Sequence, residues 1–162
     1  MPRTPVVILT AAATCAVLLA AVVTTAHVAD HDEPQPKGVQ SETSGTRVSI
    51  TDDDNTLVAV LNDSPTAQDF LTRLPATIDL ETYSDSAKIG YPSRQLTDDG
   101  APKGFEPTPG DFTYYAPYGD IALFFDDSSY EEDLIPLGVI TEGLDRLDQL
   151  QGNVTFDLAS PE

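Results

Sequence analysis

The chain has 162 residues, of which 27 are acidic and 8 are basic, so its formal net charge at pH 7 is −19. Such a surface repels nucleic acid and anionic lipid headgroups, and we expect neither as a partner of the folded part. The cysteine, Cys15, and both histidines, His27 and His31, precede the segments that are expected to fold. The folded part therefore cannot build a disulfide, a Cys- or His-ligated metal centre, or a Ser-His-Asp or Cys-His catalytic site. We expect no metal and no cofactor.

Residues 1–29 are typical of a targeting segment. Arg3 gives a positive start, and residues 6–23 are apolar apart from scattered threonines, with no charge before Asp30. This apolar run is long for a signal peptide and just long enough to span a bilayer, so cleavage after Ala26 and an uncleaved membrane anchor both stay open. Either way, the domain that follows is extracytoplasmic, secreted or held at the membrane only by this segment. Residues 30–46 predict a flexible linker before one domain at 47–162.

The domain begins with a predicted β-hairpin followed by a helix. Residues 47–51 and 56–61 favour strands, and the acidic run at 52–55 forms the turn between them. Ser64 as the N-cap and Pro65 as the first helical residue start the helix. Apolar residues at helical spacing mark its buried face: Ala67, Phe70, Leu71 and Leu74. Pro75 ends the helix.

Two more strands and a long loop come next. Residues 76–83 alternate so that Ile78 and Leu80 face the core, and residues 88–91 form a short strand that Pro92 ends. Residues 93–109 contain several glycines and prolines and no regular pattern. A loop of this length in a compact domain is often a functional flap.

The most strand-like stretch is the pair of segments 112–116 and 121–125, joined by a turn at 117–120. Ile121, Leu123 and Phe125 point to one face of the second segment, and Ala122 and Phe124 point to the other. Both faces are apolar, which indicates a strand that is covered on both sides.

The last third of the chain completes the pattern. An acidic loop at 126–133 leads to a strand at 134–141, then to a short helix marked by Leu144, Leu147 and Leu150, and to a final strand at 153–158. About eight short strands with two short helices predict a mainly β fold, a closed or nearly closed β-barrel whose ends the helices plug. A β-sandwich is the alternative.

Four strings resemble those of the bacterial cyclophilin-like domain family: DSPTAQDFLTRLP, KIGYPSRQL, GDFTYYAPYGDIALFF and LIPLGVITEGLDRL, which begin at residues 63, 88, 110 and 134. They occur in the family's order across most of residues 47–158, and the resemblance implies a small barrel related to the cyclophilins. Three positions depart from the family's usual residues: Ala87 stands in place of a Glu, Tyr118 of a Trp, and Asp120 of an Asn. True cyclophilins are peptidyl-prolyl isomerases with an Arg in a Phe-His-Arg string, which this chain lacks.

Two functions follow from this sequence. The first is a non-catalytic module in which an aromatic groove beside the long loop holds a peptide segment or a small molecule, and its expected lining is Arg94, Phe105, Tyr114, Tyr115 and Tyr118. The alternative is a peptidyl-prolyl isomerase, which needs an apolar pocket and a hydrogen-bond donor near the proline nitrogen. Arg94 is the candidate catalytic residue for that reaction, by elimination of the other arginines. A third function, hydrolysis by a pair of carboxylates from residues 126–133, requires a less polar setting than this loop offers.

Overall fold

The structure is a computed structural model and describes residues 45–160. The predicted targeting segment at 1–29 lies outside the described residues, and so do residues 30–44 of the predicted linker. Thr46, which we assigned to the linker, already belongs to the first strand. None of the helices within residues 45–160 has the length and apolar character that crossing a membrane requires.

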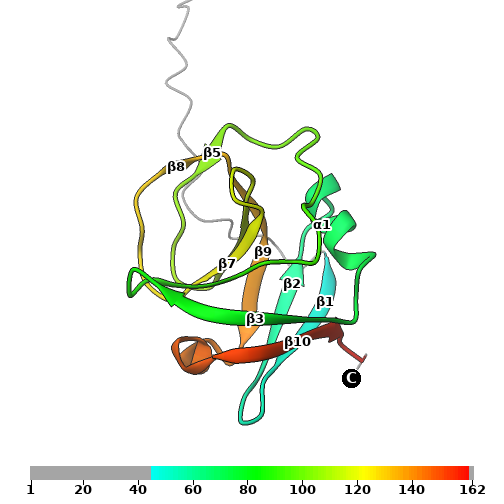
Figure 1. The fold of residues 1–162 in the computed structure, drawn as a ribbon, viewed down its shortest axis with the longest axis vertical. Coiled ribbons are helices and arrows are strands. Elements are labelled where there is room, and N and C mark those ends of the chain that lie inside the picture. The colour runs from blue at the N-terminus through cyan, green and yellow to red at the C-terminus, as the bar shows by residue number, and fades with distance from the viewer. Residues whose placement is uncertain (1–44, 161–162) are drawn as a thin grey trace, which may run out of the picture. The chain divides into compact units, whose positions relative to one another are not determined.

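Eight antiparallel strands close into a barrel, which confirms the predicted mainly β fold (Figure 1). Around the barrel the strands follow the order β1, β10, β3, β4, β7, β6, β9 and β2, and β2 pairs again with β1. Two short strands, β5 and β8, pair with each other outside the barrel. The strands are β1 (Thr46–Thr51), β2 (Thr56–Leu61), β3 (Ala76–Tyr83), β4 (Ala87–Gly90), β5 (Gly104–Phe105), β6 (Asp111–Tyr115), β7 (Asp120–Phe124), β8 (Glu131–Glu132), β9 (Leu134–Glu142) and β10 (Gly152–Leu158).

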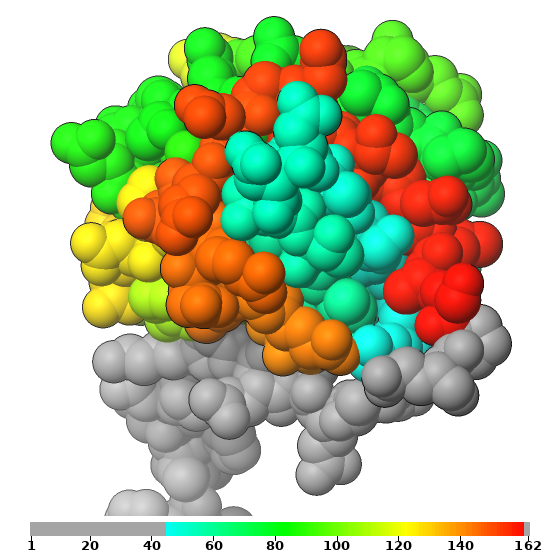
Figure 2. Space-filling view, turned by 90° about the horizontal axis from the view of Figure 1, so that it is seen from below, coloured from blue at the N-terminus to red at the C-terminus, as the bar shows by residue number. Residues whose placement is uncertain are grey.

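The acidic turn between β1 and β2 forms its own hydrogen bonds. The Asp52 carboxylate accepts from the backbone N–H groups of Asp54 and Asn55, at 3.0 and 2.6 Å. An aspartate at the start of a turn commonly satisfies the turn's backbone in this way. Figure 2 shows the resulting hairpin in cyan. On one side of it lies β10, in red, and on the other lies the orange segment that comprises β9 and the helix after it.

Two short helices close the ends of the barrel. Helix α1 (Pro65–Leu71) begins at the N-cap Ser64, whose hydroxyl accepts from the backbone N–H of Ala67 at 3.2 Å. The second helix, η1 (Leu144–Gln149), is a 3₁₀-helix. Helix α1 follows the end of β2, whereas η1 follows the end of the antiparallel neighbour β9, so the two helices occupy opposite ends of that strand pair.

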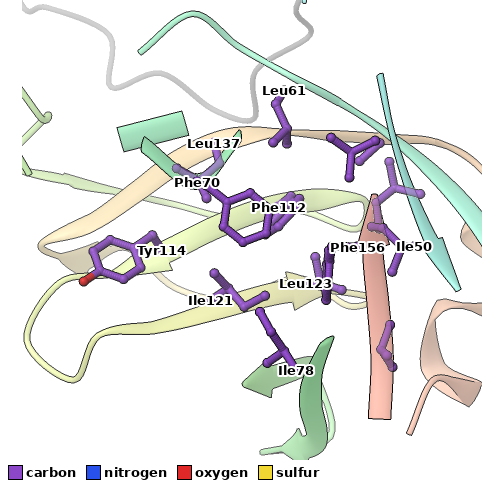
Figure 3. Close-up of a cluster of buried hydrophobic side chains, with 14 of the residues drawn as sticks. Ile50, Leu61, Phe70, Ile78, Phe112, Tyr114, Ile121, Leu123, Leu137 and Phe156 are labelled. Atoms are coloured by element: carbon purple, nitrogen blue, oxygen red, sulfur yellow. The ribbon is translucent and has the colours of Figure 1, made fainter. Parts of the chain in front are cut away.

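The barrel interior is filled largely by phenylalanine and aliphatic side chains. Phe70 of α1 meets Phe112 of β6 edge to face, with ring centroids 5.5 Å apart, and Phe156 of β10 in the same manner at 5.7 Å. Figure 3 shows the ring of Phe70 entering the barrel beside that of Phe112. All three rings are essentially inaccessible to solvent. The helix is therefore attached to the barrel by the same core that holds the strands together.

The hairpin of β6 and β7 is covered on both faces, as its alternation predicted. Ile121 and Leu123 belong to the barrel core, whereas Ala122 and Phe124 belong to a second apolar cluster on the outer face. Phe105 of β5 packs on that outer cluster. The long loop that carries β5 thus covers this side of the barrel. The sequence pattern predicted neither β5 nor β8, because two residues are too few for a period to show.

Candidate functional site

A cavity of about 510 Å³ lies on the outer face of the barrel, over β4, β7 and the end of β6. Its walls come from the turn between β3 and β4, from Pro107 near the end of the long loop, from Ser128 and Ser129 of the acidic loop, and from the short strand β8. This volume is within the range of small-molecule sites. The lining residues are Tyr83, Ser84, Ser86, Ala87, Ile89, Tyr91, Pro107, Tyr115, Tyr118, Asp120, Ala122, Phe124, Ser128, Ser129, Glu131 and Leu134.

The floor of the cavity is the apolar cluster outside the barrel. Ala87, Ala122 and Phe124 are buried, and their side chains alternate with those that fill the barrel interior. Phe105 packs against the same cluster from β5. The two alanines matter for the size of the cavity, because a larger side chain at either position would occupy part of its volume.

Four of the chain's six tyrosines line this cavity. Three of them stand at its rim with most of the side chain exposed: Tyr83 at 58%, Tyr91 at 56% and Tyr118 at 73%. Tyr115 is half-buried and meets the Tyr118 ring edge to face, with centroids 5.4 Å apart. Large aromatic side chains gathered around an open cavity are typical of a recognition surface, since each offers contact area at a small cost in conformational entropy.

Asp120, the first residue of β7, puts a buried carboxyl group in the cavity wall. The residue is 5% exposed, and its Oδ1 atom has no hydrogen-bond partner within the described part of the chain. Burial raises the pKa of Asp120 above its ordinary value, because the charged form loses its hydration. Buried polar atoms nearly always have a partner, so an orphaned carboxyl oxygen beside a cavity indicates a place for a ligand group.

The remaining ionisable groups of the cavity are also acidic or neutral. The hydroxyl of Tyr115 donates to the Glu131 carboxylate at 3.2 Å. Partial burial, and then this carboxylate, raise the pKa of Tyr115, so its hydroxyl keeps the proton that it donates. Among the lining residues that the structure describes there is no lysine, arginine or histidine.

The residues that we predicted as a groove lining are distributed over three places. Tyr115 and Tyr118 line the cavity, and Phe105 packs behind its floor. Tyr114 points into the barrel core, where its hydroxyl accepts from the backbone N–H of Leu96 at 3.0 Å (Figure 3). Arg94 lies outside the cavity, with a side chain that is 70% exposed and a guanidinium nitrogen 3.7 Å from the Asp69 carboxylate.

The arginine that organises the long loop is Arg73. Its guanidinium donates to the Asp69 carboxylate at 2.6 Å and to the backbone carbonyls of Arg94 and Gln95. Asp69 also accepts from the backbone N–H of Thr97 at 3.0 Å. Hydrogen bonds from Arg73, and the charges of both arginines, hold the pKa of Asp69 below its ordinary value despite burial, which acts in the opposite direction. The start of the loop is therefore clamped to α1.

Sequence reasoning missed Asp120, Tyr83 and Tyr91. Asp120 looked like a turn residue, and no local signal distinguishes a buried turn aspartate from an exposed one. One signal was available: the three positions at which this chain departs from the usual residues of the family it resembles, Ala87, Tyr118 and Asp120, all line the cavity.

Comparison with known proteins agrees with this architecture. Residues 50–159 match the model of the cyclophilin-like family. No curated protein matches the chain. A hypothetical protein from Archaeoglobus fulgidus, known from its solution structure, is similar in fold, with a TM-score of 0.54 and 19% identity over 74% of this chain and 99% of that one. With a family match over most of its length and a closed eight-stranded barrel, the chain belongs to the cyclophilin-like family.

Proposed function

We propose that this chain is an exported, non-catalytic binding module that holds a peptide segment or a small molecule in the cavity over β4, β6 and β7. The observation that carries the proposal is the concentration of four of six tyrosines around one open cavity. Exposed aromatic residues increase the apolar surface in contact with water, so their gathering at one place suggests that a ligand covers them.

Like most ligand sites, the cavity combines an apolar surface with a few polar groups. Its apolar floor, with Ala122 and Phe124, supplies area that a ligand removes from water. A few polar groups at defined positions, chiefly Asp120 and Glu131, supply orientation. The long loop also belongs to the folded core, since it buries Leu96 and Phe105, so point substitutions test the site better than deletion of the loop.

A thermal-shift screen of the full chain against a chemically broad library tests the proposal, because a ligand that binds only the folded state raises the melting temperature. Any hit is then tested on Ala122→Leu, which fills the floor, and on Tyr118→Ala, which removes the most exposed ring. Both variants are expected to weaken binding by about tenfold or more, as truncation of an aromatic contact residue commonly does.

Matched controls separate the cavity from the rest of the surface. Ala101→Leu makes the same chemical change away from the cavity lining, and Tyr130→Ala removes an exposed tyrosine that is not part of it. Neither control is expected to alter the affinity. Equal losses in the controls and in the cavity variants, or a screen without any ligand, would contradict the proposal.

The isomerase alternative stays a prediction. It depends on Arg94, whose guanidinium lies outside the cavity. A chymotrypsin-coupled assay tests it: activity above background that Arg94→Ala abolishes would replace the binding module with an enzyme.

Export rests on the sequence of residues 1–29. Expression in a bacterial host, followed by cell fractionation and N-terminal sequencing, tests it. A product that begins after Ala26 indicates a cleaved signal peptide, an intact membrane-bound product indicates an anchor, and a product confined to the cytoplasm would contradict export.

A further inference from the structure

We propose that the cavity selects an organic cation that carries N–H donors, a primary ammonium or guanidinium group, and that Asp120 is its counter-ion. This inference rests on the proposed binding function and names the class of ligand. It depends on three observations: a buried carboxyl oxygen without a partner, a ring of tyrosines, and a lining without basic residues.

Asp120 supplies the strongest of these observations. An ionised carboxylate at a 5% exposed position is costly unless a donor or an opposite charge meets it. Since Oδ1 has no partner among residues 45–160, a ligand N–H group is the natural donor. A charge-assisted hydrogen bond from an ammonium or guanidinium group is roughly twice as strong as a neutral one. A quaternary ammonium ion has no N–H group, so it would leave Oδ1 without a hydrogen bond.

The tyrosines complement the same kind of ligand. The faces of aromatic rings attract cations, and this attraction grows when the cation is shielded from water. Tyr115 pairs with Asp120 across β6 and β7, and Tyr118, in the turn between these strands, packs edge to face on Tyr115, so both the rings and the carboxyl group come from one hairpin. Glu131, held by the Tyr115 hydroxyl, adds a second negative charge at the rim. A carboxylate or phosphate ligand would be repelled by Glu131, and by Asp120 whenever that group is ionised.

Proton release on binding distinguishes this inference from binding of a neutral ligand. Burial raises the pKa of Asp120, so the empty cavity holds a proton there over a wider range of pH than an exposed aspartate does. A bound cation favours the charged form, and binding therefore releases that proton. The affinity for a cation should rise as the pH rises through the pKa of Asp120. The other ionisable groups that face the cavity are Tyr83, Tyr91, Tyr115, Tyr118 and Glu131.

The test uses the full chain with four simple probes: n-butylammonium, n-butylguanidinium, tetramethylammonium and the neutral n-butanol. Binding is measured by calorimetry and by tyrosine fluorescence, which reports on the cavity because the chain has no tryptophan and four of its six tyrosines line it. At about pH 8, the two N–H cations are expected to bind at least about tenfold more tightly than n-butanol or tetramethylammonium. Their affinity is expected to fall as the pH is lowered.

Asp120→Asn keeps the shape of the site and removes its charge. This variant should lose the preference for cations and the pH dependence, while it still binds n-butanol, which shows that its cavity is intact. Asp127→Asn is the matched control, since it makes the same change at an exposed position outside the cavity lining, and its effect should stay below about threefold. The inference would be overturned if the wild-type protein bound n-butanol and n-butylammonium with equal affinity. A preference for cations that survives in Asp120→Asn would also overturn it.

The source of the cation can be read from one further pair of probes. Capped Gly-Lys-Gly and Gly-Gln-Gly peptides test a protein side chain as the ligand. If the lysine peptide binds more tightly than n-butylammonium, the partner is a basic peptide, and equal affinities indicate a free amine. The cation inference fails, while the proposed function stands, if library ligands bind and Ala122→Leu blocks them but the N–H cations bind no more tightly than n-butanol. A cavity that binds no ligand at all removes the proposed function as well.

Discussion

Replacing Asp120 by asparagine is expected to stabilise the folded protein near neutral pH, although it removes a residue of the proposed site. The carboxyl group is 5% exposed and its Oδ1 atom lacks a partner in the described chain, so ionisation in the folded state is costly. Asparagine has nearly the same shape and no charge. A residue that serves a ligand commonly reduces the stability of the empty protein in this way.

The sign of the effect follows from the pKa of Asp120, which burial raises above the ordinary value of 3.8. Below that value the group is protonated in both folded and unfolded chains, so the charge has no effect on stability. As the pH rises from that value towards the higher pKa of the folded state, the unfolded chain loses its proton first, so the folded state is progressively destabilised, and above the higher pKa this loss stays constant. The stabilising effect of Asp120→Asn should therefore be small at about pH 3.5 and largest at about pH 8.

An unsatisfied buried polar group costs about 1–3 kcal/mol, and more when it is charged. Because asparagine leaves a neutral amide in the same place, we expect a net gain of about 1–2 kcal/mol at about pH 8. For a domain of this size the gain corresponds to a rise in melting temperature of about 4–8 °C. Differential scanning calorimetry at several pH values measures both the gain and its pH dependence.

Asp53→Asn is the matched control, because it removes the same charge from an exposed position at the tip of the β1–β2 hairpin. Relief of the overall negative charge acts on both variants, and only burial distinguishes them. The reasoning is refuted if the two variants raise the melting temperature equally at about pH 8, or if the gain from Asp120→Asn is larger in acid.

Three further predictions concern the fold, and urea unfolding of the full chain measures each of them. Phe70→Ala should cost about 3–5 kcal/mol, because the ring joins α1 to the barrel core, and a loss below about 1 kcal/mol would contradict that role. Gly138→Ala should cost about 3 kcal/mol, since a Cβ there would meet the backbone oxygen of Val60. The control Gly100→Ala should cost about 1–2 kcal/mol, because Gly100 has open space around it and only its φ of 70° disfavours alanine. Arg73→Gln should cost about 1–3 kcal/mol and expose the long loop to proteolysis, and unchanged cleavage would show that the clamp is dispensable.

Much of the barrel could be predicted because its signals are local. Strand alternation placed Ile78 and Leu80 in the core, and the N-cap Ser64 with Pro65 marked the start of α1. The two apolar faces of the segment at 121–125 indicated a covered strand, and the structure supplies the cover, with Phe105 on the outer face. The count of about eight short strands predicted a closed or nearly closed barrel, and the resemblance of the four strings to the cyclophilin-like family implied a barrel as well.

The candidate site could be predicted only in part. Tyr115 and Tyr118 were predicted as lining residues, and both line the cavity, because the hairpin of β6 and β7 forms part of its wall. Tyr114 alternates with Tyr115, so the neighbouring tyrosine points into the core instead, where its hydroxyl meets Leu96. Elimination singled out Arg94 among the arginines, but a side chain on a loop takes its position from whatever that loop is clamped to, which here is α1.

By itself, the sequence determined that most of this chain folds as a mainly β domain, because strand periods and turn residues act over a few positions along the backbone. The amino acids also determined that the domain has no cysteine or histidine for chemistry. Only the tertiary structure decided where a ligand site lies. The cavity is built from six strands and their connections, and whether Asp120 is buried without a partner depends on residues that barrel closure brings beside it from distant parts of the chain.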